Sequence, residues 1–252
     1  HPLGMPVLDD HYRLRLTDFA LVTGIPSHGK SAFLTEVGCR MVQRHNWTVA
    51  FASFEQQPQR DFRRNLRTYY HSKRVVHQTP EELDEADYWI DRNFSFIVPN
   101  EDDDVNLEWV LDRARASVVQ HGANMVVIDP WNEMDHSRPR DMSLTEYTGC
   151  AIKEFKRLAR GMNIHLVVAA HPAKQQRRED GTFQIPSLYD VSESAHWYNK
   201  PEVGIVVHRE SKDRTVIRVA KSRYHDQIGT PGDVSVSFST ETNHYTVLED
   251  KH

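Results

Sequence analysis

The sequence predicts an α/β fold: a mostly parallel sheet flanked by helices, with an antiparallel β extension at the C-terminal end. The first supporting observation is a stretch with the pattern G-x-x-x-x-G-K-[ST] at 24–31, placed between a β-prone segment and a helically spaced one. Apolar β-prone segments then alternate with helical ones up to residue 170, which is the order typical of a parallel sheet. From about residue 203 the chain holds short β-branched segments separated by turn residues.

Length, composition and charge limit the function classes. The 252 residues show no linker-like boundary, so we expect one domain over 1–252. We interpret residues 1–5 as a cloning remnant or a start inside a longer protein. The formal net charge of −5 argues against a uniformly basic nucleic-acid-binding surface, so such binding would need a local basic patch. No apolar run is long enough to span a bilayer, so we expect no membrane partner.

The expected parallel strands are short apolar runs, as is typical of strands buried on both faces. In chain order they lie at 19–23, 47–54, 94–98, 125–128 and 165–170. The C-terminal strands are expected at 203–208, 216–220, 234–238 and 245–248, where residues alternate or are β-branched. Between 172 and 200 the pattern breaks into a polar loop region.

The expected helices carry apolar side chains three and four residues apart. They lie at 32–44, from Pro58 to beyond Tyr69, and at 81–91, 107–121 and 144–162. Pro58 suits the first turn of a helix. The basic residues that follow it are most simply a solvated helix face.

The stretch between the first strand and the first helix predicts a phosphate-binding loop. Its glycines let the backbone N–H groups face a phosphate, and the helix N-terminus adds a favourable dipole. Lys30 would reach the β- and γ-phosphates, and the Ser31 hydroxyl would bind Mg²⁺. The alternative is a glycine turn with a surface lysine. The loop residues are Gly24, Ile25, Pro26, Ser27, His28, Gly29, Lys30 and Ser31.

Polar residues follow the other central strands, whose carboxyl ends should line one crevice. Asp129 has the position of a Mg²⁺-binding aspartate opposite Ser31; the alternative is a helix cap before Pro130. Glu55 could accept a proton from a water that attacks the γ-phosphate, or could be merely solvated. His171 could sense the γ-phosphate, although a lone His at a strand end is more often a structural hydrogen-bond donor.

An ordered set of motifs resembles the ATPase domain of hexameric replicative helicases of the DnaB type, in the Twinkle and phage primase-helicase branch. The resemblance runs from about residue 4 to residue 248. Each motif alone is shared with many ATPases, but the ordered set is more specific. The motifs are G-I-P-S-H-G-K-S at 24–31, F-A-S-F-E-Q at 51–56, V-V-I-D-P-W-N-E at 126–133, A-H-P-A-K at 170–174, Y-D-V-S-E-S-A-H-W-Y-N-K at 189–200 and V-A-K-S-R-Y at 219–224.

The resemblance implies a RecA-like P-loop NTPase core that hydrolyses ATP, or another nucleoside triphosphate, with Mg²⁺ at subunit interfaces. It implies movement along single-stranded DNA through a homo-hexameric ring, and a primase module as a candidate part of the same chain. Carried across, Glu55 would be the catalytic base, Asp129 the Mg²⁺ aspartate and His171 the phosphate sensor. The expected compartment is the cytoplasm of a bacterial or phage-infected cell, with a mitochondrial homologue as the alternative.

The resemblance also assigns residues outside the strand ends. Arg223, with Lys221 beside it, would be an arginine finger that reaches a neighbouring subunit's site, although a basic strand edge would look the same. Arg209 would stack on the nucleotide base, with Phe238 on its other side. The DNA-binding loop would hold Lys174, Arg177 and Arg178, whose charges could equally belong to a solvated loop.

Some features depart from the family pattern. Pro26 and His28 replace smaller residues of the phosphate loop, and Glu193-Ser194 stands where a glycine-serine pair is expected. Residues 1–252 hold no zinc-binding module, primase module or N-terminal linker helix, so we expect them alone to be monomeric or weakly assembled. Two alternatives stay open: a RecA-like recombinase or mediator that forms filaments on single-stranded DNA, and a RecA-like ATPase with no nucleic-acid role.

Overall fold

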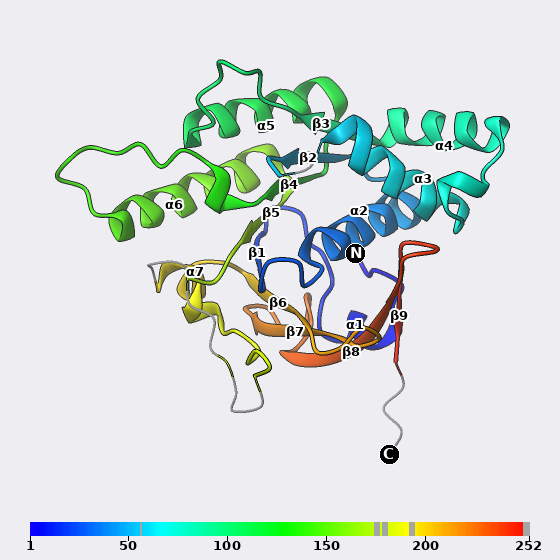
Figure 1. Ribbon diagram of the computed structural model, residues 1–252. Coiled ribbons are helices and arrows are strands. Elements are labelled where there is room, and N and C mark those ends of the chain that lie inside the picture. The colour runs from blue at the N-terminus through cyan, green and yellow to red at the C-terminus, as the bar shows by residue number, and fades with distance from the viewer. Residues whose placement is uncertain (56, 174–176, 178–180, 192–194, 249–252) are drawn as a thin grey trace.

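A nine-stranded sheet runs through the part of the chain that this computed structural model describes, namely residues 1–55, 57–173, 177, 181–191 and 195–248 (Figure 1). Its strand order is β3-β2-β4-β5-β1-β6-β7-β8-β9. The strands are β1 (Phe19–Thr23), β2 (Val49–Ser53), β3 (Phe94–Ile97), β4 (Met125–Asp129), β5 (His165–Ala170), β6 (Val203–Arg209), β7 (Thr215–Ser222), β8 (Gly232–Ser239) and β9 (His244–Val247).

The sheet is parallel from β3 to β6 and antiparallel from β6 to β9, so the predicted fold class is confirmed. In β1, β2, β4 and β5 every residue is buried, as expected for strands covered on both faces. In the middle of β8 the buried Val234 and Val236 alternate with the partly exposed Ser235 and Ser237, because one face of the extension meets the core and the other lies near solvent.

Two layers of helices cover the parallel part of the sheet (Figure 1). Alternate residues of each strand point to opposite faces. Thus Ala20 and Val22 pack in a core with α2 (Lys30–His45), α3 (Arg63–His71) and α4 (Pro80–Asn93). Phe19 and Leu21 pack in a second core, with α5 (Leu107–His121) and α6 (Leu144–Met162).

Helix boundaries follow local chemistry. Thr79 and Ser143 form capping boxes at the starts of α4 and α6, and each satisfies backbone N–H groups that the first turn leaves free. Gly122 ends α5 in the left-handed conformation with a φ of 68°, which costs glycine nothing. The helix expected from Pro58 begins as a π-helical turn, η1 (Pro58–Phe62), and continues as α3.

The structure adds elements that the sequence pattern did not indicate. Residues 1–5 pack into the fold, with Leu3 and Met5 buried in the core, and lead into α1 (Pro6–Asp9). The region expected to be a polar loop contains α7 (His196–Asn199), whose Trp197 is fully buried. Short helical turns complete the set: η2 (Val75–His77), η3 (Trp131–Glu133) and η4 (Leu188–Asp190).

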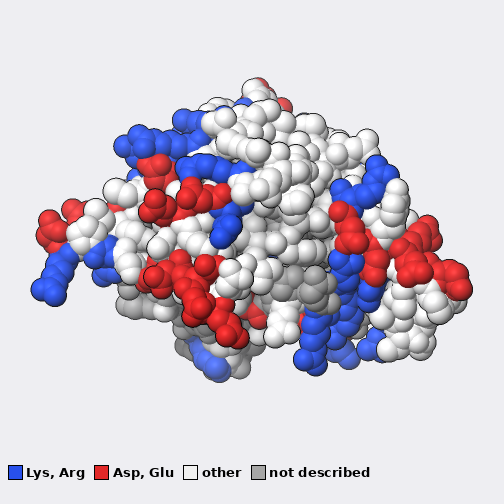
Figure 2. Space-filling view, turned by 90° about the horizontal axis from the view of Figure 1, so that it is seen from above, with Lys and Arg blue, Asp and Glu red and all other residues white. Residues whose placement is uncertain are grey.

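Surface charge is mixed rather than uniformly basic. On the face seen in Figure 2, basic and acidic side chains lie in small adjoining groups, in keeping with the formal net charge of −5. A polyanion would therefore need a local cluster of cations. Within the described ranges, no helix combines the length and apolar character needed to cross a bilayer.

Candidate functional site

The carboxyl ends of four neighbouring strands open onto one cavity of about 480 Å³. The strands β2, β4, β5 and β1 lie side by side in that order, and Ser53 of β2 pairs with Asp129 of β4. Because parallel strands end at the same edge, residues just beyond each strand meet there. The cavity is lined by Pro26, Ser27, Gly29, Lys30, Ser31, Ala32, Glu55, Asp129, His171 and Arg209.

The loop between β1 and α2 needs both of its glycines. A Cβ on Gly24 would lie 2.2 Å from the backbone oxygen of Val207, so only glycine lets the loop pass β6. Gly29 has a φ of 99° and is the N-cap of α2 without a side-chain cap. The first N–H groups of α2 are thus left for a ligand, and the helix dipole favours an anion at this end.

Lys30 is buried beside the loop, with 5% of its surface exposed. Its Nζ donates hydrogen bonds to the carbonyl oxygens of Gly24 (2.9 Å) and Ile25 (3.3 Å). Burial lowers the pKa of Lys30 to about 8, although Asp129 and Glu55 partly oppose the shift. An anion in the same cavity would stabilise the charged form of this buried ammonium.

Ser31 and Asp129 are joined directly: the Ser31 hydroxyl donates to Oδ2 of Asp129 at 2.6 Å. Burial raises the pKa of Asp129, while the Ser31 hydrogen bond and Lys30 act in the opposite direction. Pro130, not Asp129, is the N-cap of η3, so Asp129 does not cap a helix. Its carboxylate is therefore available to a ligand in the cavity, which Asp129 lines.

A hydroxyl and a carboxylate oxygen are hard donors that suit Mg²⁺, which usually keeps several ligands from water or phosphate. Among the described residues, no group of three or more His, Cys, Asp and Glu side chains could hold a metal ion by itself. The Ser31–Asp129 pair thus fits a cation that arrives with a phosphate ligand.

Glu55 and His171 face each other across the cavity edge. The His171 Nε2 lies 3.3 Å from the Glu55 Oε1, and about half of the Glu55 side chain is exposed. The His171 backbone N–H donates to the side-chain oxygen of Asn132 at 2.7 Å. Sequence reasoning did not single out Asn132, although it lies inside the quoted 126–133 motif. The Asn132 side chain thus holds the backbone at His171, just after β5, in place.

His28, in the phosphate loop, contacts two segments that are distant in the sequence. Its Nδ1 accepts a hydrogen bond from the Arg209 backbone N–H at 3.0 Å, and its ring lies 5.1 Å from that of His208 and 6.2 Å from that of Phe183. Burial lowers the pKa of His28 to about 4, helped by the positive charges of His208, Arg209 and Lys30. The ring is therefore neutral at physiological pH.

Arg209 and Phe238 lie near the loop but do not share a cavity. Arg209 lines the 480 Å³ cavity. Phe238 lines a smaller one, of about 170 Å³, and both cavities border Ser31 and Ala32. The structure thus leaves room beside the first turn of α2, with Arg209 on the larger cavity and Phe238 on the smaller.

Lys221 and Arg223 lie near the amino ends of the parallel strands, away from the cavity. Lys221 pairs with Gly204 at the start of β6, whereas Arg209 ends that strand, a separation of roughly 17 Å along the strand. The Lys221 Nζ donates to the carbonyl oxygens of Tyr198 (2.6 Å) and Asn199 (2.8 Å). Arg223 also donates to Asn199 O, at 3.0 Å. Neither lines this chain's own cavity.

The predicted DNA-binding cations are only partly visible. Lys174 and Arg178 lie outside the described residues, as do Glu193 and Ser194. Arg177 is exposed and stacks over the ring of Phe183 at 4.5 Å. Since Phe183 also approaches His28, the segment after β5 is in contact with the phosphate loop.

Comparisons with known proteins place the chain in a family and identify a relative. The family described as AAA domain matches residues 10–177. The Twinkle homolog protein, chloroplastic/mitochondrial, of Arabidopsis thaliana is 30% identical over 256 residues, which cover 96% of this chain and 36% of that protein. This chain thus spans about a third of that relative's length.

Two solved structures share the fold. A structure described as an ATPase domain superposes with a TM-score of 0.79 and 21% identity, covering 98% of this chain and 91% of that one. A DnaB-like replicative helicase, described with its interactions with primase, gives a TM-score of 0.78 and 21% identity, covering 98% of this chain and 63% of that one.

Proposed function

Because this chain belongs to the AAA domain family and has the fold of DnaB-like helicase ATPase domains, we propose that it is the ATP-hydrolysing motor of a replicative DNA helicase. One observation carries this proposal most directly. The phosphate loop, Glu55, Asp129 and His171 surround one cavity at the carboxyl edge of a parallel sheet, although they come from four separate strands.

The loop and Lys30 would bind the triphosphate. The free N–H groups at the start of α2 would take the β-phosphate, and the Lys30 ammonium would exchange the Gly24 and Ile25 carbonyls for phosphate oxygens. The base would extend past Ser31 and Ala32, where Arg209 and the cavity beside Phe238 lie.

Ser31 and Asp129 would hold Mg²⁺, since their oxygens already lie 2.6 Å apart at the cavity wall. The ion would supply positive charge for the β- and γ-phosphate oxygens. Glu55, at the cavity rim, would accept the proton of the attacking water. His171 is 3.3 Å from Glu55, so it would respond to any change at that carboxylate, and Asn132 would hold it in place.

A partner subunit would complete the site. Arg223 lies far from its own chain's cavity, which suits a guanidinium that acts on the next subunit in a ring. Its permanent charge would stabilise negative charge on the transferring phosphoryl group. Lys221, held by the Tyr198 and Asn199 carbonyls, would keep this segment in place.

Single-stranded DNA would be the track, with movement from five-prime to three-prime. Arg177 is an exposed cation on the segment after β5, and Lys174 and Arg178 belong to the same segment. Such cations bind phosphates without reading sequence. The DnaB-like relative is described as interacting with primase, and we propose a primase partner here, in the same or a separate chain.

ATP hydrolysis by the full-length protein, with and without single-stranded DNA over a salt series, tests this function. We expect DNA to stimulate hydrolysis and the stimulation to fall steeply with salt, because phosphate contacts release counterions. Hydrolysis that ignores DNA at every salt concentration would instead indicate an ATPase without a nucleic-acid role. Electron microscopy of the DNA complex would separate rings from the filaments of a recombinase.

A further inference from the structure

The C-terminal strand reaches the phosphate loop through one buried side chain. The hydroxyl of Tyr245, in β9, donates a hydrogen bond to the carbonyl oxygen of Gly29 at 3.2 Å. Only 3% of Tyr245 is exposed. The contact joins residues that are 216 positions apart, and neither the phosphate-loop pattern nor the family motifs include Tyr245.

The Gly29 carbonyl lies where the phosphate loop ends and α2 begins. It also accepts the N–H of Phe33 at 2.9 Å, a bond of the i to i−4 type that starts α2. In a trans peptide the C=O of one residue and the N–H of the next point in opposite directions. Fixing the Gly29 oxygen therefore fixes the direction of the Lys30 N–H, at the helix end that lines the cavity.

Tyr245 is itself held by α2. Its backbone N–H donates to Oε2 of Glu36 at 3.2 Å, and Glu36 is almost fully buried. The other Glu36 oxygen accepts from Nε of Arg40 at 2.6 Å. The Tyr245 ring packs against Phe238, with centroids 4.8 Å apart. Backbone, ring and hydroxyl of Tyr245 are thus each fixed by a separate contact.

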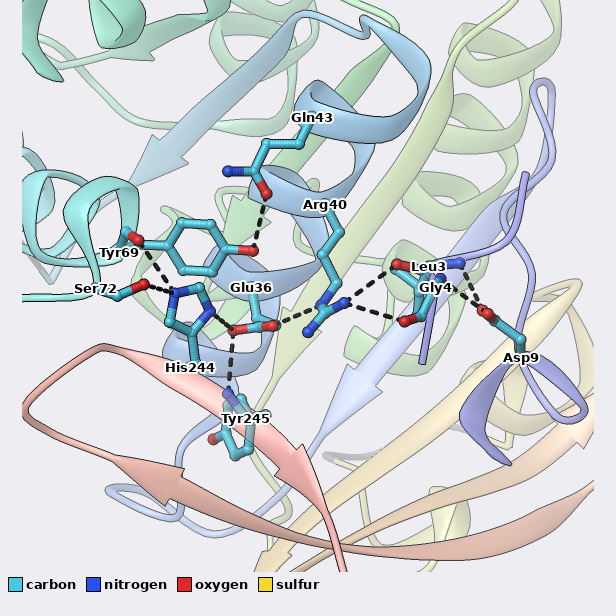
Figure 3. A network of polar contacts seen from close by, with 10 residues as sticks. All are labelled: Leu3, Gly4, Asp9, Glu36, Arg40, Gln43, Tyr69, Ser72, His244 and Tyr245. Atoms are coloured by element: carbon cyan, nitrogen blue, oxygen red, sulfur yellow. Dashed lines mark hydrogen bonds and ion pairs between the residues drawn. The ribbon is translucent and has the colours of Figure 1, made fainter. Parts of the chain in front are cut away.

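The network extends from Arg40 to the start of the chain (Figure 3). The Arg40 Nη1 donates to the carbonyl oxygens of Leu3 (3.5 Å) and Gly4 (3.3 Å), whose N–H groups are held by the Asp9 carboxylate. Three distant parts of the sequence are therefore tied together along α2, and the hydroxyl at one end of the chain of contacts touches the phosphate loop.

We propose that Tyr245 is a positioning residue: its hydroxyl holds the Gly29–Lys30 peptide plane so that the loop is ready for a di- or triphosphate. This inference rests on the proposed nucleotide site. Burial raises the pKa of Tyr245, so the phenol stays protonated at neutral pH and can donate. If the ring acted by packing alone, phenylalanine would replace it without loss.

The test compares two variants of the full-length protein. Tyr245→Phe removes only the hydroxyl. Tyr12→Phe is the matched control, because its hydroxyl is also buried and hydrogen-bonded, to His165 Nε2 at 3.1 Å, but does not touch the cavity. Affinity for a non-hydrolysable ATP analogue with Mg²⁺ and affinity for ADP are measured by titration, alongside thermal unfolding.

We expect Tyr245→Phe to weaken both ligands by about threefold to tenfold, the effect of one lost hydrogen bond that orders a binding group. ADP should lose as much as the ATP analogue, because the β-phosphate is common to both. Tyr12→Phe should bind both ligands as the wild type does, even if it unfolds at a lower temperature. In hydrolysis assays KM should rise more than kcat falls.

Wild-type affinity in Tyr245→Phe, or equal losses in both variants, would overturn the inference. The same data separate this from failure of the proposed function. If the wild type binds the analogue but DNA does not stimulate hydrolysis, the helicase proposal fails while the Tyr245 comparison still decides. If the wild type binds neither ligand, both proposals are overturned.

Discussion

At the residue scale, burial makes Lys30 a pH-sensitive element of nucleotide binding. Its pKa in the free protein is about 8, and a bound phosphate would raise it, because the ammonium gains an anionic partner. Binding strength from this contact should be present in full well below pH 8. It should be lost progressively as the pH rises through that value.

We therefore predict that affinity for a Mg²⁺–ATP analogue is nearly constant from pH 6.5 to 7 and about tenfold weaker at pH 9, since about one Lys30 in ten stays protonated one unit above its pKa. Titration calorimetry measures this directly. Lys30→Ala should bind weakly and lack this pH dependence. A flat wild-type profile between pH 7 and 9 would contradict the prediction.

His28 shows what a single departure from the family pattern does. The sequence marked it only as a larger residue in the loop. The structure shows that it accepts the Arg209 N–H and meets Phe183. Its pKa of about 4 means that it does not titrate in the range where Lys30 does, so the two effects of pH are separable.

At the element scale, the segment after β5 touches the phosphate loop through Phe183 and His28. We predict that Phe183→Leu reduces DNA stimulation of hydrolysis severalfold while leaving basal hydrolysis close to that of the wild type, because the ring links Arg177 to the loop. Steady-state assays with saturating single-stranded DNA measure the ratio.

The control for Phe183 is Tyr189→Leu, which removes an exposed aromatic of the same region that stacks on Tyr198 instead. Full DNA stimulation in Phe183→Leu, or an equal loss in both variants, would show that this contact does not couple the segments.

The elements themselves were largely predictable, for a physical reason. Strands buried on both faces must be apolar throughout, and helices on a sheet must be apolar every three to four residues, so both leave a pattern. The short helix α7 leaves none, because four residues make one turn, and Trp197 is placed by the surrounding core. The packing of Leu3 and Met5 was likewise invisible, since two apolar residues carry no period.

The site was predictable to the extent that it follows the strands. Residues at strand ends, such as Asp129 and His171, converge because the sheet is parallel. The contact of Tyr245 with Gly29 could not be predicted, because it depends on how the antiparallel extension curls back over α2. The roles of Arg223 and Lys221 also stay predictions, since they concern a neighbouring subunit.

At the scale of the whole molecule, the resemblance to DnaB-type ATPase domains is confirmed by the family match, the Twinkle homolog and the shared fold. The division of chemistry between two subunits is the proposal that gives this fold its function. The carboxyl ends of the parallel strands would hold the phosphates. The opposite ends, where Arg223 lies, would contact the nucleotide of the next subunit in the ring.

Mixing two inactive variants of the full-length protein tests that division most directly. Lys30→Ala removes the phosphate contact and Arg223→Ala removes the donated guanidinium, so each variant alone should be nearly inactive. In a one-to-one mixture, about half of the subunits have an intact loop and about half of their neighbours have an intact Arg223. Both intact parts therefore meet at roughly a quarter of the ring's interfaces. We predict that hydrolysis returns in proportion. No recovery at concentrations where sedimentation shows mixed rings would contradict an arginine supplied by the partner subunit.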